Sequence, residues 1–370
     1  MSTTALAAIV EKPGDPFTIE EVQLDDLRAN EVMVRIAAAG LCHTDLTVQA
    51  GLLPFPLPGI LGHEGAGTVV ATGSAVSHVS VGDHVALSFT SCGECTNCRA
   101  GRPAYCVTWL PDNIINGGTR PDGTATVHRK GGAPLGAHFF GQSSFSSMAI
   151  ADARSVVRIA DDIPFELAAP LGCGIQTGAG TVFKVLNPPA GSALAVFGTG
   201  AVGLAAIMAA NLLPLAQVIA IDRVQSRLDL AAELGATACI NAEDGHVAEQ
   251  LSALVPDGLD FAIDTTANMA VLRTAVDSLA TLGTCAVVGA APPGTELSID
   301  ISAFLVGKRI VGIAEGDSDP AATIDLLTTL YRRGRFPLER LVRTYPIEKI
   351  NDAVADAHSG IAVKPVMTFN

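Results

Sequence analysis

The chain has 370 residues, and at about 150 residues per domain this length predicts roughly two domains. Its 23 basic and 37 acidic residues give a net charge of −14 without a basic cluster, which argues against a nucleic-acid-binding protein. Hydrophobic residues make up 49% of the chain and charged residues 16%, so the composition excludes a disordered protein and supplies a large core.

The longest uncharged stretch, residues 185–221, exceeds the length needed to span a membrane. Prolines and glycines interrupt it, so we interpret it as two buried strands and a helix and expect no membrane partner. The N-terminal residues lack the basic and apolar regions of a secretory signal, which predicts a cytoplasmic protein. In that reducing compartment, clustered cysteines favour metal binding over disulfides.

The first 173 residues contain short apolar runs such as 31–36, many turns, and six of the eight cysteines. These runs predict a mostly-β domain. Residues 111–136 are rich in glycine, proline, asparagine and threonine, and they predict a long excursion with some strand of its own.

From residue 190 to 312 the pattern becomes a regular alternation of strands and helices. It predicts a parallel, doubly wound α/β sheet of the Rossmann type. We expect a helix at 226–234 and strands at 193–197, 218–221, 238–240, 261–263, 285–288 and 310–312. The remaining residues predict a helix at 321–332 and an apolar run at 363–369.

A glycine fingerprint follows the first of these strands, with Gly198, Gly200 and Gly203 ahead of a helical run at 202–212. The first glycine permits a tight turn, the second a close approach to a pyrophosphate, and the third close packing of helix on strand. Asp222 ends the next strand, where a carboxylate would bind an adenosine ribose and repel a 2′-phosphate. The pattern favours NAD over NADP, although Arg223 weakens that preference slightly; the alternative is a turn-forming glycine cluster and a surface aspartate.

Four cysteines are spaced C-x2-C-x2-C-x7-C, at Cys92, Cys95, Cys98 and Cys106. Four thiolates complete a tetrahedral shell, which is typical of a structural zinc site. An iron–sulfur cluster also uses four thiolates, but the spacing does not follow the ferredoxin patterns. Disulfides remain the alternative if the protein is not cytoplasmic.

Three other candidate ligands, Cys42, His63 and Cys173, are spread along the chain. Two thiolates and one imidazole leave a fourth tetrahedral position open, as a catalytic zinc requires. Spacing does not establish that they converge: each cysteine could be a small buried residue, and the histidine could be part of the core.

The segments GLCHTDL, GHEGAG, the four-cysteine loop, GCGIQTGAG and GTGAVG occur in the order seen in zinc-dependent medium-chain alcohol dehydrogenases. The chain resembles this family over essentially its whole length. The runs PLPGILGHEGAG and FFGQSSF make it most similar to the bacterial benzyl- and aryl-alcohol dehydrogenases. The resemblance implies a mostly-β GroES-like catalytic domain (1–172 and 315–370), an NAD-binding Rossmann domain (173–314), and a homodimer or homotetramer.

The resemblance also implies roles for individual residues. Cys42, His63 and Cys173 would bind a catalytic zinc, and the four-cysteine loop a structural one. Asp45 would orient His63, Glu64 would lie beside this ligand and could approach the metal transiently, and Thr44 would take the proton of the alcohol. The residues implied at the NAD site are His43 and Lys364 (pyrophosphate), Thr177 (nicotinamide), Asp222 and Arg227 (adenosine ribose), and Gly198, Gly200, Ala201, Val202 and Gly203 (fingerprint).

The implied reaction is the reversible oxidation of a primary alcohol to an aldehyde. Many relatives carry a histidine at the end of the proton relay, where this chain has Thr47, so we expect the relay to end in another group. The implied substrate pocket favours aromatic or long apolar alcohols, and it consists of Leu52, Phe55, Phe89, Trp109 and Phe140. The alternatives are a geraniol-type dehydrogenase, an enzyme that retains its NAD, and a non-catalytic relative.

Overall fold

The computed structural model describes residues 3–369. The chain divides into two compact units, one of residues 1–173 and 319–370 and the other of residues 174–318. The sequence places these boundaries one and four residues earlier, at 172/173 and 314/315. In the structure, therefore, Cys173 belongs to the first unit.

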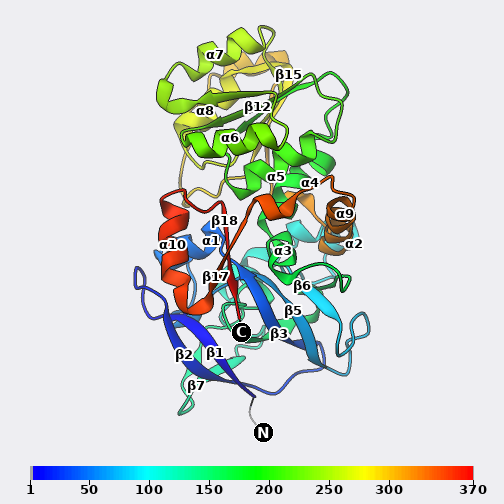
Figure 1. The fold of residues 1–370 in the computed structure, drawn as a ribbon, viewed down its shortest axis with the longest axis vertical. Coiled ribbons are helices and arrows are strands. Elements are labelled where there is room, and N and C mark those ends of the chain that lie inside the picture. The colour runs from blue at the N-terminus through cyan, green and yellow to red at the C-terminus, as the bar shows by residue number, and fades with distance from the viewer. Residues whose placement is uncertain (1–2, 370) are drawn as a thin grey trace. The chain divides into compact units, whose positions relative to one another are not determined.

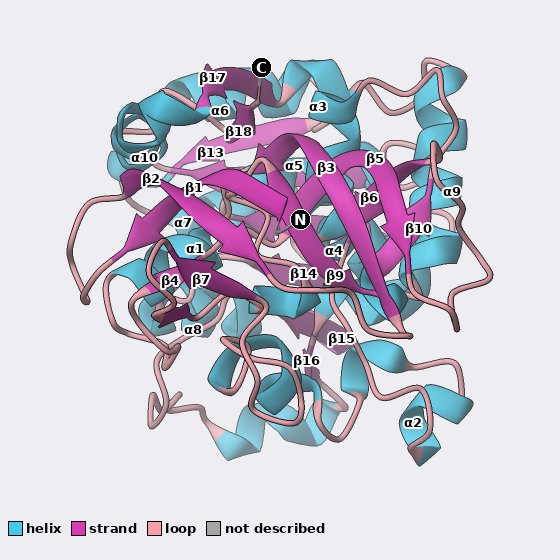
Figure 2. Cartoon of the chain, turned by 90° about the horizontal axis from the view of Figure 1, so that it is seen from below, coloured by secondary structure: helices cyan, strands magenta, loops and turns pink. Residues whose placement is uncertain are grey.

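The first unit is mostly β-structure, built from a five-stranded sheet in the order β4-β1-β2-β7-β8 and a seven-stranded sheet in the order β10-β6-β5-β3-β18-β17, with β9 paired to β3. Figure 2 shows β3, β5 and β6 side by side. The strands are β1 (Thr3–Val10), β2 (Thr18–Leu24), β3 (Glu31–Gly40), β4 (Gly59–Ile60), β5 (Glu64–Thr72), β6 (His84–Leu87), β7 (Val127–Arg129), β8 (Pro134–Leu135), β9 (Met148–Asp152), β10 (Val156–Arg158), β17 (Val342–Pro346) and β18 (Lys364–Thr368). The helices are α1 (His43–Gln49), α2 (Thr96–Arg99), α3 (Phe165–Ala168), α9 (Pro320–Arg332) and α10 (Ile350–His358).

Strand β3 organises this unit because it pairs with three partners, β5, β9 and β18, all antiparallel. Its side chains are buried at most positions, as expected of a central strand. The pairing of Val366 with Gly40 brings the last strand of the chain against the end of β3. Residues from both ends of the sequence therefore meet where β3 turns into α1.

The excursion at 111–136 contains the two short strands β7 and β8, which pair as a hairpin, so it has some strand of its own as the sequence predicts. One buried arginine attaches it to the sheet. Arg120 is 2% exposed, and its guanidinium donates to the carboxylates of Glu31 and Asp25 and to the carbonyl of Ala125. Residues about 90 positions apart in the sequence are thereby held together.

The second unit contains a six-stranded parallel sheet in the order β13-β12-β11-β14-β15-β16. All six predicted strands are present, which confirms the doubly wound α/β class. Helix α6 packs against β12 (Figure 1), and α8 packs against β14. The strands are β11 (Ala193–Phe197), β12 (Gln217–Asp222), β13 (Ala238–Asn241), β14 (Leu259–Asp264), β15 (Leu279–Val287) and β16 (Arg309–Gly312). The helices are α4 (Gly174–Gly180), α5 (Ala201–Ala210), α6 (Gln225–Glu233), α7 (Val247–Leu254) and α8 (Met269–Asp277).

One strand differs from its predicted bounds: β15 begins at Leu279, six residues before the apolar run that predicts it. Its first half is partly exposed and interrupted by a left-handed residue, Leu282, with a φ of 65°. In this first part only Leu279 pairs with β14, and regular pairing resumes at Thr284 after a shift in register. The segment is therefore irregular, and no apolar pattern in its sequence indicates a strand.

The long uncharged stretch folds into β11, α5 and β12. Strand β11 is buried along its whole length, and α5 is buried from Gly203 to Ala210, which explains why neither carries a charge. None of the helices among residues 3–369 is long and apolar enough to cross a membrane.

Candidate functional site

Four residues from distant parts of the first unit converge in space. One potential ligand atom each from Cys42, His63, Glu64 and Cys173 lies within 4.8 Å of all the others. Cys42 precedes α1, and Cys173 ends the first segment of the unit. His63 lies just before β5, and Glu64 begins that strand. The three zinc ligands implied by the resemblance therefore come together, with Glu64 beside them.

Asp45 is completely buried and contacts the loops that carry the candidate metal ligands. Its Oδ2 accepts the backbone N–H of Cys42 at 2.9 Å, which closes a capping box at the start of α1. Its Oδ1 lies 3.0 Å from Nδ1 of His63 and also accepts the backbone N–H of Gly62 at 3.0 Å. One carboxylate thus orients two of the three candidate ligands, and it leaves Nε2 of His63 available to a metal.

The donor set fits a zinc ion. Nε2 of His63 is buried and has no hydrogen-bond partner among the described residues, which is the condition expected of a nitrogen that binds a metal. The neighbouring Cys173 lowers the pKa of Cys42 well below that of an ordinary thiol, against the effect of burial. Burial by itself would lower the pKa of His63, but Asp45 outweighs it and raises that pKa.

Gln142 also positions the group, and sequence reasoning did not identify it. Its buried amide donates to the carbonyls of His63 and Ser88, both at 2.9 Å, and accepts the N–H of Gly65 at 3.0 Å. The hydroxyl of Ser88 in turn donates to the carbonyl of Gly172 at 2.6 Å, next to the third ligand. In the sequence, only its place as a polar residue in the FFGQSSF run points to Gln142.

Lys364 is buried and paired with Glu64. Its Nζ lies 2.9 and 2.8 Å from the two carboxylate oxygens and donates to the carbonyl of Leu41 at 3.3 Å. A side chain on Gly40 would collide with Glu64, so this glycine makes room for the pair. A pyrophosphate bound by Lys364, as the resemblance implies, would have to share the ammonium group with Glu64.

The remaining residues around α1 differ in exposure and bonding. The hydroxyl of Thr44 lies 3.9 Å from Sγ of Cys42, beside the candidate metal ligands. The hydroxyl of Thr47 donates to the carbonyl of His43 one turn earlier at 2.9 Å, and His43 itself is exposed. Thr47 is thus bonded within its own helix.

The four cysteines at 92, 95, 98 and 106 form a second cluster, with one sulfur of each within 4.8 Å of the others. Backbone N–H groups of Glu94 and Cys95 point at Sγ of Cys92 at 3.4 and 3.3 Å, as in loops that hold a tetrahedral metal. The backbone N–H of Cys98 lowers the pKa of Cys95 to about 6. None of the eight cysteines, all of which lie among residues 3–369, forms a disulfide, and the four sulfurs of this cluster fit a structural zinc.

The glycine fingerprint has a different structural role at each position. Gly198 has a φ of 90°, which favours glycine, and a Cβ on Gly203 would collide with the carbonyl of Gly198. A Cβ on Gly200 would meet nothing within 4 Å, so this side of the loop is open. With Ala201 and Val202 beginning α5, the loop fits a pyrophosphate at a helix N-terminus.

Asp222 ends β12 and is bonded to the same loop. Its Oδ2 accepts the N–H and hydroxyl of Thr199 at 2.6 and 2.9 Å, while Oδ1 accepts two N–H groups that follow it, at 2.8 and 3.0 Å. Arg227 lies on α6, and its Nε is buried without a hydrogen-bond partner in residues 3–369. Both side chains lie near the carboxyl ends of parallel strands, where open sheets bind ligands.

Thr177, in α4, contacts a glutamate that the sequence did not single out. Glu315 is 8% exposed, and its Oε2 accepts from the amide of Gln176 at 3.2 Å and from the hydroxyl of Thr177 at 3.5 Å. Its φ of 49° is unusual for a residue other than glycine. Such strained backbone is common at functional sites.

Aromatic rings surround His63. Phe140 stacks on the imidazole with centroids 4.3 Å apart, and Phe139 meets it edge-on at 5.3 Å. Trp109 contacts Phe140 at 5.5 Å, and Phe55 contacts Phe139 at 5.1 Å. We call Phe55, Phe89, Trp109, Phe139 and Phe140 the aromatic cluster; Phe89 joins it through Trp109 at 6.4 Å.

The sequence predicts four of these five residues as pocket residues and misses Phe139. The remaining predicted pocket residue, Leu52, is 58% exposed. Phe140 has a φ of 54°, so the backbone is strained where its ring covers the candidate metal ligand.

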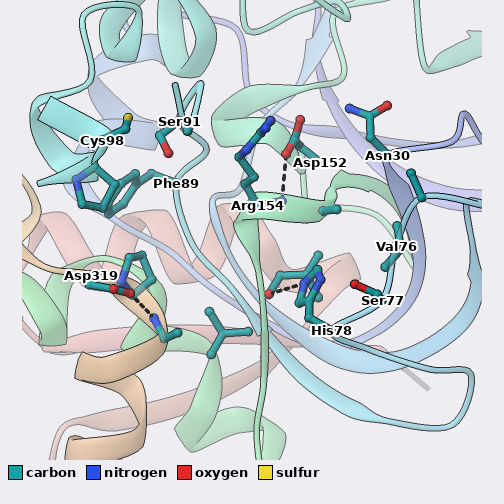
Figure 3. Close-up of a pocket in the computed structure, with 18 of the residues that line it drawn as sticks. Asn30, Val76, Ser77, His78, Phe89, Ser91, Cys98, Asp152, Arg154 and Asp319 are labelled. Carbon is teal, nitrogen blue, oxygen red and sulfur yellow. Dashed lines mark hydrogen bonds between the residues drawn. The ribbon is translucent and has the colours of Figure 1, made fainter. Parts of the chain in front are cut away.

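A cavity of about 610 Å³ in the first unit meets the aromatic cluster at Phe89. Its lining includes Cys98, Phe89, Asp152 and Arg154 (Figure 3), but Cys42, His63 and Cys173 are not among the residues that form it. The cavity borders the four-cysteine loop, because Gly93 and Cys98 of that loop line it together with Arg154. We therefore do not assign the catalytic chemistry to it.

Comparison with known families assigns both parts of the chain. Residues 28–161 match the alcohol dehydrogenase GroES-like domain. Residues 201–329 match the zinc-binding dehydrogenase family. The first match covers His63 and the four-cysteine loop, and the second covers the end of the glycine fingerprint, from Ala201 to Gly203, and Asp222.

Individual relatives agree over the full length. A geraniol dehydrogenase from Castellaniella defragrans is 39% identical over 99% of this chain and 98% of its own. The crystal structure of an alcohol dehydrogenase zinc-binding domain protein from Burkholderia ambifaria is 44% identical, with a TM-score of 0.97 and full coverage of both chains. That of a benzyl alcohol dehydrogenase from Acinetobacter calcoaceticus is 38% identical, with a TM-score of 0.95 and full coverage of both chains. The chain belongs to the zinc-dependent medium-chain alcohol dehydrogenases, a family of oxidoreductases that use zinc and a nicotinamide cofactor.

Proposed function

We propose that the protein oxidises primary aromatic alcohols of the benzyl type to aldehydes, reversibly, with NAD as hydride acceptor. The observation that carries this proposal is the aromatic cluster, whose member Phe140 stacks on the candidate zinc ligand His63. Rings that meet edge-on and face-on offer an aromatic substrate favourable contacts beyond simple apolar burial.

The side chains around the metal site have distinct tasks in this reaction. Zinc, when bound by Cys42, His63 and Cys173, supplies Lewis acidity towards a hydroxyl oxygen, and NAD supplies the hydride acceptor. Asp45 keeps the proton of His63 on Nδ1, so that Nε2 faces the site. The hydroxyl of Thr44, beside Cys42, would accept the proton of the alcohol while it passes its own proton on to the next group of the relay.

The carboxylate of Asp222 supports NAD as the cofactor. A negative charge at the end of β12 repels the 2′-phosphate of NADP, while its oxygens can accept a ribose hydroxyl. Arg227, with its buried Nε, lies one helical turn beyond on α6 and would contact the same ribose.

A geraniol-type allylic alcohol is the second candidate substrate. The geraniol dehydrogenase relative is as similar to this chain as the benzyl alcohol dehydrogenase is, at 39% and 38% identity. An aromatic cluster also accommodates a planar apolar chain, so a substrate panel must separate the two. An enzyme that retains its NAD is a third possibility, and the absorption spectrum of the purified protein would reveal it.

We further propose a cytoplasmic homo-oligomer. Thiolate ligands require reducing conditions, which the cytoplasm provides. Strand β16 is the last in its sheet, and apolar side chains just before it are exposed, with Ile301 at 70% and Leu305 at 85%. Pairing of this edge with a second copy of the chain would cover both the free edge of β16 and the exposed apolar side chains before it.

The test is the initial rate of NAD reduction with benzyl alcohol, using protein purified without chelator. We expect kcat/KM with benzyl alcohol to exceed that with ethanol by at least about tenfold, because ethanol buries far less apolar surface. NADP in place of NAD, and geraniol in place of benzyl alcohol, are run in parallel. A protein that oxidises geraniol but not benzyl alcohol would contradict the aromatic assignment.

A further inference from the structure

Trp109 is the only tryptophan of the chain and lies within the aromatic cluster. Its ring meets Phe140 edge-on at 5.5 Å, and Phe140 stacks on His63 at 4.3 Å. One ring therefore separates the indole from the candidate zinc ligand. The other members of the cluster are phenylalanines, so the indole nitrogen is the only hydrogen-bond donor that side chains of the cluster carry.

This nitrogen is buried and has no hydrogen-bond partner among residues 3–369. A buried tryptophan N–H usually finds an acceptor, because leaving it unpaired destabilises the fold. An exception in a folded protein needs a reason. A donor reserved for a bound molecule is one such reason.

The backbone around Trp109 is held in place. The buried amide of Asn113 donates to the carbonyl of Trp109 at 2.8 Å and is bonded in both directions to the backbone of Thr90, at 2.9 Å each. The backbone N–H of Trp109, as distinct from its indole N–H, donates to the carbonyl of Cys106 at 2.9 Å. The four-cysteine loop and Asn113 thus fix the residue that carries the indole, which is the arrangement expected of a built recognition group.

We propose that Nε1 of Trp109 donates a hydrogen bond to an oxygen on the aromatic ring of the substrate, and that the preferred substrates are hydroxy- or methoxy-substituted benzyl alcohols. This inference rests on the proposed function. A site that carries a buried donor rejects a substrate without an acceptor more strongly than an apolar pocket rejects a change of size. The rest of the cluster, being phenylalanine, accepts the ring itself.

The experiment compares pairs of substrates that match in size. For each ring position, kcat/KM is measured with the methoxybenzyl and the ethylbenzyl alcohol, in the wild type and in W109F. The methoxy-to-ethyl ratio cancels any general loss of activity in the variant, and the comparison of the two ratios cancels the electronic effect of the substituent. F89L is the matched control, since Phe89 contacts Trp109 but carries no donor.

We expect W109F to lower the methoxy-to-ethyl ratio about five- to thirty-fold at one ring position, and F89L to leave it within about two-fold. A ratio unchanged by W109F at every ring position overturns the inference. A wild-type enzyme that oxidises none of these alcohols overturns the proposed function instead, and the inference with it.

A second measurement does not depend on the variant. Because the chain has one tryptophan, ¹⁵N-labelled wild-type protein gives a single indole N–H signal. In the presence of NADH, a methoxybenzamide, which is an unreactive analogue of the aldehyde, should shift this proton downfield relative to the matching ethylbenzamide. Identical positions with both amides for every ring isomer overturn the inference.

Discussion

Asp45 shows how much of the site depends on a single side chain. The same buried carboxylate caps α1, accepts the N–H of Gly62 and faces Nδ1 of His63. The first contact is local, whereas the others join the loop before β5 to a helix 18 residues away. Loss of its charge should therefore affect metal binding more than folding.

We expect D45N to weaken binding of the catalytic zinc about 10- to 100-fold, because an amide orients His63 less well than a carboxylate does. Zinc content after dialysis against graded chelator, measured by atomic absorption, would fall from two ions per chain to one. The four-cysteine site is an internal control, and D83N, an aspartate of the same unit that accepts the N–H of Ser80, is the matched control. Equal retention of both ions in D45N would contradict this role.

At the scale of elements, the excursion at 111–136 depends on the buried side chain of Arg120. It contacts Glu31, which is 3% exposed, at the start of β3, and Asp25 just after β2. Partial burial raises the pKa of Asp25, but the hydrogen bond from Arg120 outweighs it and the net pKa lies below 3.8. The ionised pair therefore stabilises the fold above about pH 4, and this stabilisation is lost as the pH falls through the lowered pKa.

R120M should cost about 3–5 kcal/mol of unfolding free energy, because it leaves the buried carboxylate of Glu31 without its cation. The matched control is R28M, which removes a largely exposed pair with Asp122 and should cost less than about 1 kcal/mol. Urea midpoints at pH 7 and pH 3 measure both effects, and the deficit of R120M should shrink at pH 3. Equal losses of unfolding free energy in R120M and R28M would contradict a stabilising role for the contacts of Arg120 with Glu31 and Asp25.

At the scale of the whole molecule, the two cysteine-containing sites belong to one unit and the glycine fingerprint to the other. Each unit closes its own core, but the six-stranded sheet ends at β16 with an unpaired edge. Exposed apolar side chains at this edge mark an interaction surface more often than an accident of the fold. We therefore expect copies of the chain to associate along the β16 edge.

We expect the wild-type protein to have the mass of a dimer or a larger even-numbered oligomer in light scattering, and L305D to shift it towards the monomer, because a buried unpaired charge at the interface is costly. L254D is the matched control: Leu254 is a partly exposed leucine of the same unit, at the end of α7, away from the β16 edge. A monomeric wild-type protein would refute the proposed assembly.

The sequence alone determined what depends on local patterns. The strands of the second unit, the fingerprint at Gly198, and the spacing of Cys92 to Cys106 follow from apolar periodicity and from ligands close together along the chain. The apolar run that predicts β15 covers only its last third, because the part before it is irregular and only Leu279 there pairs with β14 until Thr284.

Only the tertiary structure decided how distant residues meet. Cys42, His63 and Cys173 converge because β3, β5 and the loop at Gly172 are brought together by pairing and by the bonds of Gln142 and Ser88. The pair between Lys364 and Glu64 depends on β18 joining β3 across some 300 residues. Such contacts leave no periodic trace in the sequence, since closing a long loop is governed by the whole fold and not by the residues next to each ligand.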